Sequence, residues 1–342
     1  MISGANLMDY RLRYNTKDYV IKRIKRAVIP YLFWSCFAFL FYWTFSQQGL
    51  LSGLKLKNII NLPLDIINNK YMRVYWFFLP LFICYLSIII LSRLIEKKDT
   101  LYFITIWIFL AQFFLPFLAN LFHLKINPVL TSSPLGGGFV LYILLGYFFS
   151  RIQLSNTSKK ILYLIGIISL LARFFSLMLS PEAPAKINRI FTGYINIATV
   201  FYSLAIFLFV KYISPRIDNI IREIIERNRT LGNTFLNCLE IVRDCSLGIY
   251  LLHPYFTHKL IPLLGMNTSS IYYRIFIYYR ILGPFVIVCI CCTLTLIFLF
   301  MLNFITLIFK KFHFYVIRFK NINRISNVYP NYLDYEVMGK QS

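Results

Sequence analysis

Eight apolar runs constrain the fold of this chain more than any other feature. Each is close to the roughly 17 to 25 residues that cross a bilayer as a helix. They cover 28–46, 75–94, 101–122, 136–150, which is short, 161–180, 191–213, 245–264 and 281–309. With 58% hydrophobic residues and a mean hydropathy of +0.65, no soluble core could bury so much apolar surface. The sequence therefore predicts an all-α, polytopic membrane helix bundle of about 8 transmembrane helices.

Positive charge is distributed between the runs rather than in one tract. The chain has 36 Lys and Arg against 13 Asp and Glu, a net charge of +23. Of these cations, 25 fall in one set of alternate connections and 10 in the other, with Arg173 inside a run. Because cytoplasmic loops carry the excess of Lys and Arg, we predict a multi-pass plasma-membrane protein with both termini in the cytoplasm. The scattered charge does not favour a nucleic-acid partner.

No internal repeat or low-complexity linker divides the runs, so the chain is interpreted as a single domain over residues 1–342. It would comprise a cytoplasmic basic segment at 1–27, a transmembrane bundle at 28–309 and a cytoplasmic tail at 310–342. Cations among aromatic residues early in the tail are typical of an anchor to anionic membrane lipids.

The longest cytoplasmic connection contains isoleucines at helical spacing. Ser214 suits an N-cap and Pro215 suits the first helical position. The apolar positions that follow are Ile217, Ile220, Ile221, Ile224 and Ile225. We therefore predict a separate amphipathic helix that begins at Ser214 and lies along the inner leaflet.

The runs contain few groups that could perform chemistry. No Asp or Glu lies near the middle of a run, which argues against a proton- or sodium-coupled transporter. No metal-ligand spacing or phosphate-binding loop is found, and we expect no metal. Arg173 is the one cation well inside a run. Its side chain either snorkels outward or turns inward to an anionic or hydroxylated acceptor. His253 lies in an apolar run before Pro254, where an imidazole needs a hydrogen-bond partner or a wet cavity.

A basic cluster lies at the start of the first run, in KRIKRAVIPYLFWS at residues 22–35. Arg23 and Arg26 are three residues apart, so on a regular helix they share a face and can hold one anionic group. Pro30 lacks a backbone donor and is expected to kink the helix. The alternative is that these cations only anchor the span on its positive side.

Several motifs occur in the order of a known family. They are RxxRxxxPYLxWS (Arg23, Arg26, Pro30, Tyr31, Leu32, Trp34, Ser35), YWFF at Tyr75–Phe78, YxLLGY at Tyr142–Tyr147 and SLGIYLLHP at Ser246–Pro254. In this combination the chain resembles the acyltransferase 3 family of inner-membrane acyltransferases over nearly its whole length.

The resemblance implies transfer of an acyl group, usually acetyl from cytoplasmic acetyl-CoA, to a hydroxyl of a surface glycan or glycolipid. The site residues that it implies are Arg23 and Arg26 for the CoA phosphates, Trp34, Tyr75 and Trp76 for the pocket walls, and His253, Tyr250 and Ser246 for a polar catalytic element.

The chain also departs from the family's pattern. Members usually have ten spanning helices, and the first carries a histidine thought to act as base on the acceptor hydroxyl. Residues 1–8 correspond to the end of the second helix, so we expect a start set too late, a truncated gene or a degenerate member. In some members a histidine lies two residues before the tryptophan of YW, where this chain has Val74. We therefore expect little or no acetyl transfer from residues 1–342 alone.

Two other classes of protein stay open. A glycan flippase or polymerase would also be basic and poor in carboxylates, but it would not bind acetyl-CoA. A non-catalytic remnant that associates with membrane complexes would keep the hydrophobic pattern and lack activity.

Overall fold

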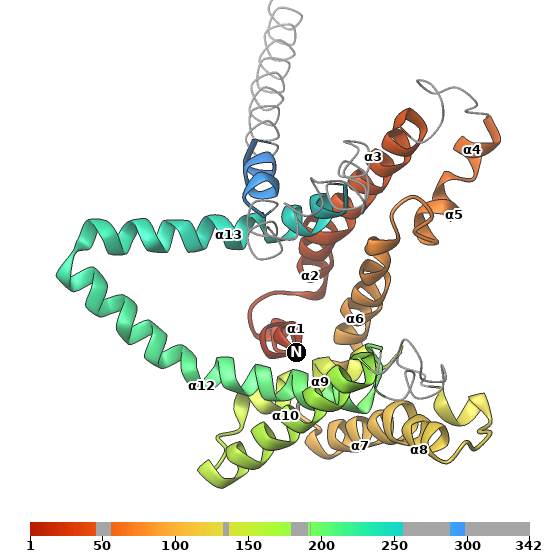
Figure 1. Cartoon of the computed structure of the whole chain (residues 1–342), viewed down its shortest axis with the longest axis vertical. Coiled ribbons are helices and arrows are strands. Elements are labelled where there is room, and N and C mark those ends of the chain that lie inside the picture. Colours follow the sequence, from red (N-terminus) through yellow and green to blue (C-terminus); the bar gives the residue numbers. More distant parts are fainter. Residues whose placement is uncertain (46–55, 133–136, 179–190, 192, 256–287, 298–342) are drawn as a thin grey trace, which may run out of the picture. The chain divides into compact units, whose positions relative to one another are not determined.

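The computed structural model describes residues 1–45, 56–132, 137–178, 191, 193–255 and 288–297. Its regular elements within these ranges are all helices, which confirms the all-α fold class (Figure 1). The chain clusters into two units, residues 1–232 and residues 233–342, which are described separately. The interpretation of the chain as a single domain stays a prediction.

The first unit begins with two short elements, α1 (Ile2–Leu7) and the 3-10 turn η1 (Tyr10–Leu12). A long helix follows from Thr16, built from α2 (Thr16–Arg23), the π-helical turn η2 (Ile24–Val28) and α3 (Ile29–Phe45). Asn15 caps its start, because its side-chain oxygen accepts a 2.8 Å hydrogen bond from the backbone N–H of Asp18.

Both π-helical turns in the described part of the chain end two residues before a proline. The turn η2 precedes Pro30, and η4 (Leu110–Phe114) precedes Pro116. A proline ring collides with the carbonyl four residues earlier, which here belongs to Arg26 or Gln112 in the middle of each π turn. The wider turn gives that carbonyl room, so the disturbance predicted at Pro30 is a π turn inside a continuous helix.

Four helices in the described ranges are long and apolar enough to cross a membrane: Thr16–Thr44, Arg73–Leu91, Lys98–Leu121 and Ile197–Arg227. The second combines the 3-10 turn η3 (Arg73–Phe77) with α6 (Phe78–Leu91), and the third combines α7 (Lys98–Phe109), η4 and α8 (Leu115–Leu121). Shorter apolar helices are α9 (Phe139–Arg151) and Val288–Ile297. The connections contain α4 (Leu56–Ile60), α5 (Leu62–Ile67) and η5 (Pro128–Thr131).

Two predicted boundaries are wrong. The helix α12 runs from Ile197 to Arg227 with Pro215 inside it, so no separate helix begins at Ser214. Pro215 leaves the carbonyl of Lys211 without its helical donor, but residues 214–220 are exposed and water can satisfy that carbonyl. The helix α13 (Arg229–Tyr255) begins well before the predicted residue 245. Residues 256–264, most of 281–309 and the whole tail lie outside the described residues.

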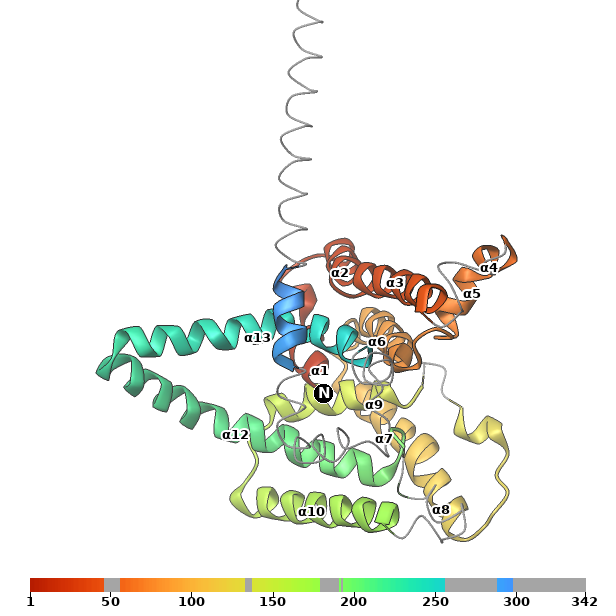
Figure 2. The same ribbon diagram turned by 45° about the horizontal axis from the view of Figure 1, so that its top comes forward.

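The core of the first unit surrounds α9, against which α1 packs (Figure 2). Glycine permits the close approach, since a Cβ on Gly4 would collide with the carbonyl of Ile143 and one on Gly146 with the backbone of Met1. The basic N-terminal segment also folds into this core. Tyr10 and Tyr19 are fully buried and stack with their ring centroids 4.2 Å apart.

The helix α10 (Asn156–Met178) lies beside α12 (Figure 2). Gly166 faces Ala205 at their contact. At the other flank of α12, Lys211 Nζ donates to the carbonyls of Phe149 (2.9 Å) and Ile152 (2.7 Å) at the C-terminal end of α9. A cation is favourable there because the last helical carbonyls lack intrahelical donors.

The described part of the second unit consists of α13 from Asn233 and the helix Val288–Ile297. They approach closely at Gly248, where a Cβ would collide with the side chain of Thr295. Cys245 Sγ lies 3.8 Å from the carbonyl oxygen of Cys292 in the same region. None of the seven cysteines, all of which lie in the described ranges, forms a disulfide.

Candidate functional site

Arg23 lies at the end of α2, immediately before the π turn, and its guanidinium is held between two aromatic rings. Its Cζ is 5.6 Å from the ring centroid of Tyr19 and 5.5 Å from that of Tyr85. Its Nε is buried and has no hydrogen-bond partner among the described residues. Because a buried donor without a partner is costly, this nitrogen marks a place where a ligand oxygen would be stabilised.

A cavity of about 270 Å³ lies beside Arg23, between the α2–η2 segment and α6. Apart from Arg23 and two tyrosines, its lining is aliphatic or aromatic, including Val28, Phe82, Leu86 and Ile89. The arrangement offers a cation at one side of an apolar space, which suits an amphiphilic ligand with an anionic group.

Arg26 is placed differently from Arg23. It is exposed, whereas Arg23 is half-buried. The expectation that the two share a helical face assumed a regular α-helix, but the π turn Ile24–Val28 separates them. An extra residue in that turn changes the angle between the two positions. Their joint role with one anion stays a prediction.

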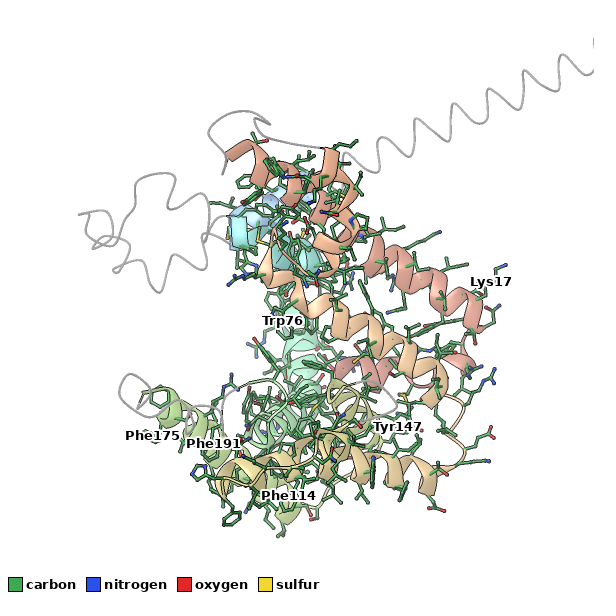
Figure 3. All side chains as sticks on the ribbon, turned by 90° about the vertical axis from the view of Figure 1, so that its right-hand side faces the viewer. Lys17, Trp76, Phe114, Tyr147, Phe175 and Phe191 are labelled. Carbon is green, nitrogen blue, oxygen red and sulfur yellow. The ribbon has the colours of Figure 1, made fainter. Side chains whose placement is uncertain are left out.

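The predicted pocket walls contact different neighbours. Trp34 is buried and packs edge to face with Phe33 and Phe37 of its own helix. Trp76 (Figure 3) packs against Tyr194, with ring centroids 4.6 Å apart, and against Phe139 at 6.2 Å.

Tyr75 is only 1% exposed and belongs to an aromatic cluster with Tyr31 and Phe78. The cavity it lines has a volume of about 10 Å³, too small for a ligand. Of the three predicted walls, Trp76 is therefore the one whose ring partners border a larger cavity.

A polar cluster fixes the segment that leads to this tyrosine. The hydroxyl of Tyr71 donates to Asp65 Oδ2 at 2.6 Å, and Lys70 Nζ donates to the same oxygen at 2.9 Å. Burial would raise the pKa of Asp65, but these two bonds outweigh it and hold that pKa below its usual value. Burial and the adjacent carboxylate raise the pKa of Tyr71 to about 12.

The larger cavity, of about 280 Å³, lies between α6, α9 and the start of α12. Much of its lining is apolar, but six residues in it carry hydroxyl groups: Ser3, Tyr142, Tyr194, Thr199, Tyr202 and Ser203. Tyr142 Oη donates to the carbonyl of Tyr194 at 2.6 Å. We call it the hydroxyl-lined cavity.

Sequence reasoning did not select these hydroxyl residues. Single hydroxyls in apolar runs have no characteristic spacing, and Thr199, Tyr202 and Ser203 on α12 lie 57 to 61 positions after Tyr142 on α9. The available signal was that a hydroxyl inside a membrane span needs a partner. Tyr142 was visible only as part of the YxLLGY motif.

Arg173 contacts groups at and just before the start of α12. Its Nη1 donates to the carbonyl of Gly193 and to Thr199 Oγ1, both at 3.0 Å, and its Cζ is 5.8 Å from the ring centroid of Tyr202. Thr199 in turn donates to the same Gly193 carbonyl at 2.7 Å. Arg173 therefore supports two residues that line the hydroxyl-lined cavity.

The predicted catalytic element lies in the second unit. Ser246, Tyr250 and His253 are four and then three residues apart on α13, so they lie along one face of the helix. Ser246 Oγ donates to the carbonyl of Arg243 at 2.8 Å. His253 Nδ1 lies 3.2 Å from the carbonyl oxygen of Ile249, which supplies the partner expected for this imidazole. A carbonyl only accepts, so Nδ1 carries the proton in that contact.

A family model described as an acyltransferase domain matches residues 1–304 of the chain. No curated protein and no solved structure matches it. Within the described residues, no group of three His, Cys, Asp or Glu side chains could hold a metal ion.

Proposed function

The chain belongs to the acyltransferase 3 family of membrane acyltransferases, and from this premise we propose that it transfers an acyl group from acyl-CoA to a hydroxyl of a cell-surface polysaccharide or glycolipid. Acetyl-CoA is the proposed donor, and it is proposed to enter its site from the cytoplasm. The observation that carries the proposal is the buried Nε of Arg23, which has no partner among the described residues and borders an apolar cavity.

The donor end is argued from charge and cavity shape together. A guanidinium forms charge-assisted hydrogen bonds to phosphate oxygens. In Arg23 the Nε donor has no partner among the described residues, so it is available to such an oxygen. Lys22, Lys25 and Arg26 are exposed next to it and add positive potential. CoA joins phosphates to a long, weakly polar arm, so its phosphates suit these cations and its arm suits the apolar cavity of about 270 Å³.

The helix α6 lines both the cavity beside Arg23, which is proposed to hold the donor, and the hydroxyl-lined cavity. Phe82, Tyr85, Leu86 and Ile89 face the first, and Phe77, Pro80, Leu81 and Cys84 face the second. Each set follows helical spacing, and the sets lie on different faces of α6. Their centres differ by about five residues, or roughly 7 Å along the helix axis at 1.5 Å per residue. The two cavities therefore share α6 as a common wall.

His253 is the proposed candidate base on α13, where its Nδ1 lies 3.2 Å from the Ile249 carbonyl oxygen. In acyl transfer the acceptor oxygen attacks the thioester carbonyl, a base takes the hydroxyl proton, the C–S bond breaks, and that proton passes to the CoA sulfur. Tyr250 and Ser246, on the same face of α13, are proposed as further members of this polar element.

Localisation to the plasma membrane with cytoplasmic termini is proposed from the distribution of Lys and Arg. A reporter fused after Lys98 or Lys160 should lie in the cytoplasm, and one fused near Pro184 should lie outside. The reverse pattern would remove Arg23 from the compartment that holds acyl-CoA.

Donor binding provides the central test. Arg23→Ala and Arg26→Ala should each weaken CoA binding by about 1.5 to 3 kcal/mol in calorimetry on purified protein, the range for hydrogen bonds to charged groups. Lysine at either position should rescue only part of the affinity, because it lacks the planar fork. Lys17→Ala is the matched control, since Lys17 is an exposed cation of the same helix (Figure 3). Unchanged CoA affinity in both arginine variants would favour the anchor interpretation.

The catalytic role is tested separately. Acyl transfer by residues 1–342 alone, measured in cells without another family member, would contradict the expected inactivity and make His253 the leading base candidate. His253→Gln should then reduce that transfer by roughly 10²- to 10⁴-fold with CoA affinity unchanged, the usual contribution of a positioned base. The control is His123→Asn, because His123 is exposed and its positive φ of 55° is tolerated by asparagine. Equal transfer rates in the two variants would assign His253 a structural role.

A further inference from the structure

A further cavity adjoins the hydroxyl-lined cavity at Tyr202. It has a volume of about 350 Å³ and lies between α10 and α12. Apart from two tyrosines its lining carries no polar side chain, and it includes Gly166, Leu170, Ala205 and Phe209. We call it the apolar groove. Such a lining provides almost no hydrogen-bond partners for a polar head group. It does provide a continuous apolar contact surface for an apolar chain.

Much of the lining of the apolar groove is exposed. Four residues that line it are themselves about half exposed: Ile167 (56%), Leu170 (49%), Ile206 (55%) and Phe209 (55%). In a membrane-spanning helix pair such exposed apolar side chains contact lipid. A long apolar chain can therefore enter the groove sideways from the bilayer without crossing water.

Tyr202 lies at the boundary between the apolar groove and the hydroxyl-lined cavity, because it lines both. A ligand with its apolar chain in the groove reaches Tyr142, Thr199 and Ser203 by extending past the Tyr202 ring. Those hydroxyls are the groups that a saccharide would require for hydrogen bonding.

Arg173 supplies charge at the junction. Its recorded partners are neutral, namely the Gly193 carbonyl, the Thr199 hydroxyl and the Tyr202 ring. Within the described ranges no carboxylate forms an ion pair with it. A cation at membrane depth is costly and marks a binding site by default. Its positive potential favours an anionic group beside Tyr202.

We propose that the acceptor is a lipid-linked saccharide, in which a phosphate joins a sugar to a long apolar chain. The chain lies in the apolar groove, the phosphate lies near Arg173, and the sugar lies in the hydroxyl-lined cavity. The inference rests on the proposed function for the reaction that follows, but the binding step does not require acyl-CoA.

The binding test uses a synthetic polyisoprenyl phosphate, which contains the chain and the phosphate and needs no assumption about the sugar. The full chain in detergent should bind this probe, and polyisoprenol, which lacks the phosphate, should bind roughly tenfold or more weakly because a charge-assisted hydrogen bond is lost. An excess of phosphatidylglycerol should not displace the probe. Displacement by phosphatidylglycerol would overturn the proposal, since the site would then hold bulk anionic lipid.

Two variants act on different parts of the site. Arg173→Gln should lower affinity for the phosphate probe and leave polyisoprenol binding unchanged, with Arg173→Lys retaining part of the affinity. Ile206→Trp should fill part of the apolar groove and weaken both probes, because Ile206 lines the groove and is 55% exposed. Val210→Trp is its control, because Val210 is exposed on α12 outside the groove lining. Equal binding by the wild type, Ile206→Trp and Arg173→Gln would overturn the proposal.

CoA binding on the same preparations separates the two proposals. Loss of probe binding with intact CoA binding would refute the lipid-linked acceptor and leave the acyltransferase proposal standing. Probe binding without CoA binding would support the acceptor site and refute the proposed donor.

Discussion

The helices α9 and α10 are both apolar, yet they bury opposite kinds of residue. In α9 the buried positions are mainly large and apolar: Val140, Leu141, Ile143, Leu144, Tyr147 and Phe148, together with Gly146. In α10 the buried positions are small or polar: Gly166, Ser169 and Ser176. Its large apolar side chains are exposed, including Phe175 at 57% (Figure 3).

The difference follows from what surrounds each helix. The neighbours of α9 are protein, including α1, α6, α7 and α12, so its large side chains fill the core. Lipid tails are as apolar as leucine, so α10 gains little by burying leucine against protein. It gains instead from close backbone approach at Gly166 and from polar contacts such as that of Arg173 with Thr199. Hydropathy alone thus identifies a span without showing which face meets protein.

A charge on the exposed face of α10 should have the largest effect. Ile168 lies near the middle of the helix and is 57% exposed. Ile168→Lys should cost about 2.5 to 3.5 kcal/mol of insertion free energy if that face meets lipid. Ile161→Lys, near the helix end, should cost much less because the lysine can snorkel. The measurement is the yield of membrane-inserted protein, and equal yields would show that this face does not contact lipid.

Overpacking α9 should rank second. Gly146→Ala places a methyl group against the backbone of Met1, which cannot rotate away as a side chain can. The variant should lose about 1 to 3 kcal/mol, measured as a lower thermal unfolding midpoint in detergent. Gly137→Ala is the control, because nothing lies within 4 Å of its added Cβ. A midpoint as high as that of the control would contradict the close packing of α1 on α9.

The parts of the fold that could be predicted are those set by local sequence composition rather than by three-dimensional contacts. The spans were visible because a 20-residue apolar helix is set by local composition, and the predicted run 75–94 agrees with Arg73–Leu91 to within a few residues. Pro215 was misplaced because proline at a first helical position and proline inside a helix look alike in sequence. The π turn before Pro30 depends on the three-dimensional clash with the Arg26 carbonyl, so the pairing of Arg23 with Arg26 could not be settled from spacing.

In the candidate site, too, local features could be predicted from the sequence and features that depend on tertiary contacts could not. Arg23 was found because a cation beside an apolar run stands out locally. Its burial between Tyr19 and Tyr85 required the packing of α2 on α6, which joins residues 66 positions apart. The hydroxyl-lined cavity and the apolar groove were not predicted, because they arise from contacts among α6, α9, α10 and α12 that leave no local pattern.

A destabilising change on α10 at its contact with α12 should be compensated by a second change on α12. Gly166→Ala brings its new methyl group against the Ala205 methyl, so it should destabilise by roughly 1 kcal/mol or more. Ala205→Gly removes the obstructing atom, and the double variant should recover most of that loss. A coupling energy of about 0.5 to 3 kcal/mol in this cycle would identify the contact. Strict additivity of the two changes would mean that α10 and α12 do not meet there.

The smallest effect should come from removing one polar contact on α9. Tyr142 is half-buried and its hydroxyl donates to the Tyr194 carbonyl at 2.6 Å. Tyr142→Phe keeps the ring packing and should cost about 0.5 to 1.5 kcal/mol, the net value of such a bond. Tyr102→Phe is the matched control, because the recorded contact of Tyr102 is the stacking of its ring on Phe148 at 4.5 Å, which survives the change. Since α9 depends chiefly on apolar packing, its polar contact should matter less than Gly146. A loss from Tyr142→Phe larger than that from Gly146→Ala would reverse the contrast between the two helices, because α9 would then be held, like α10, mainly by its polar contacts.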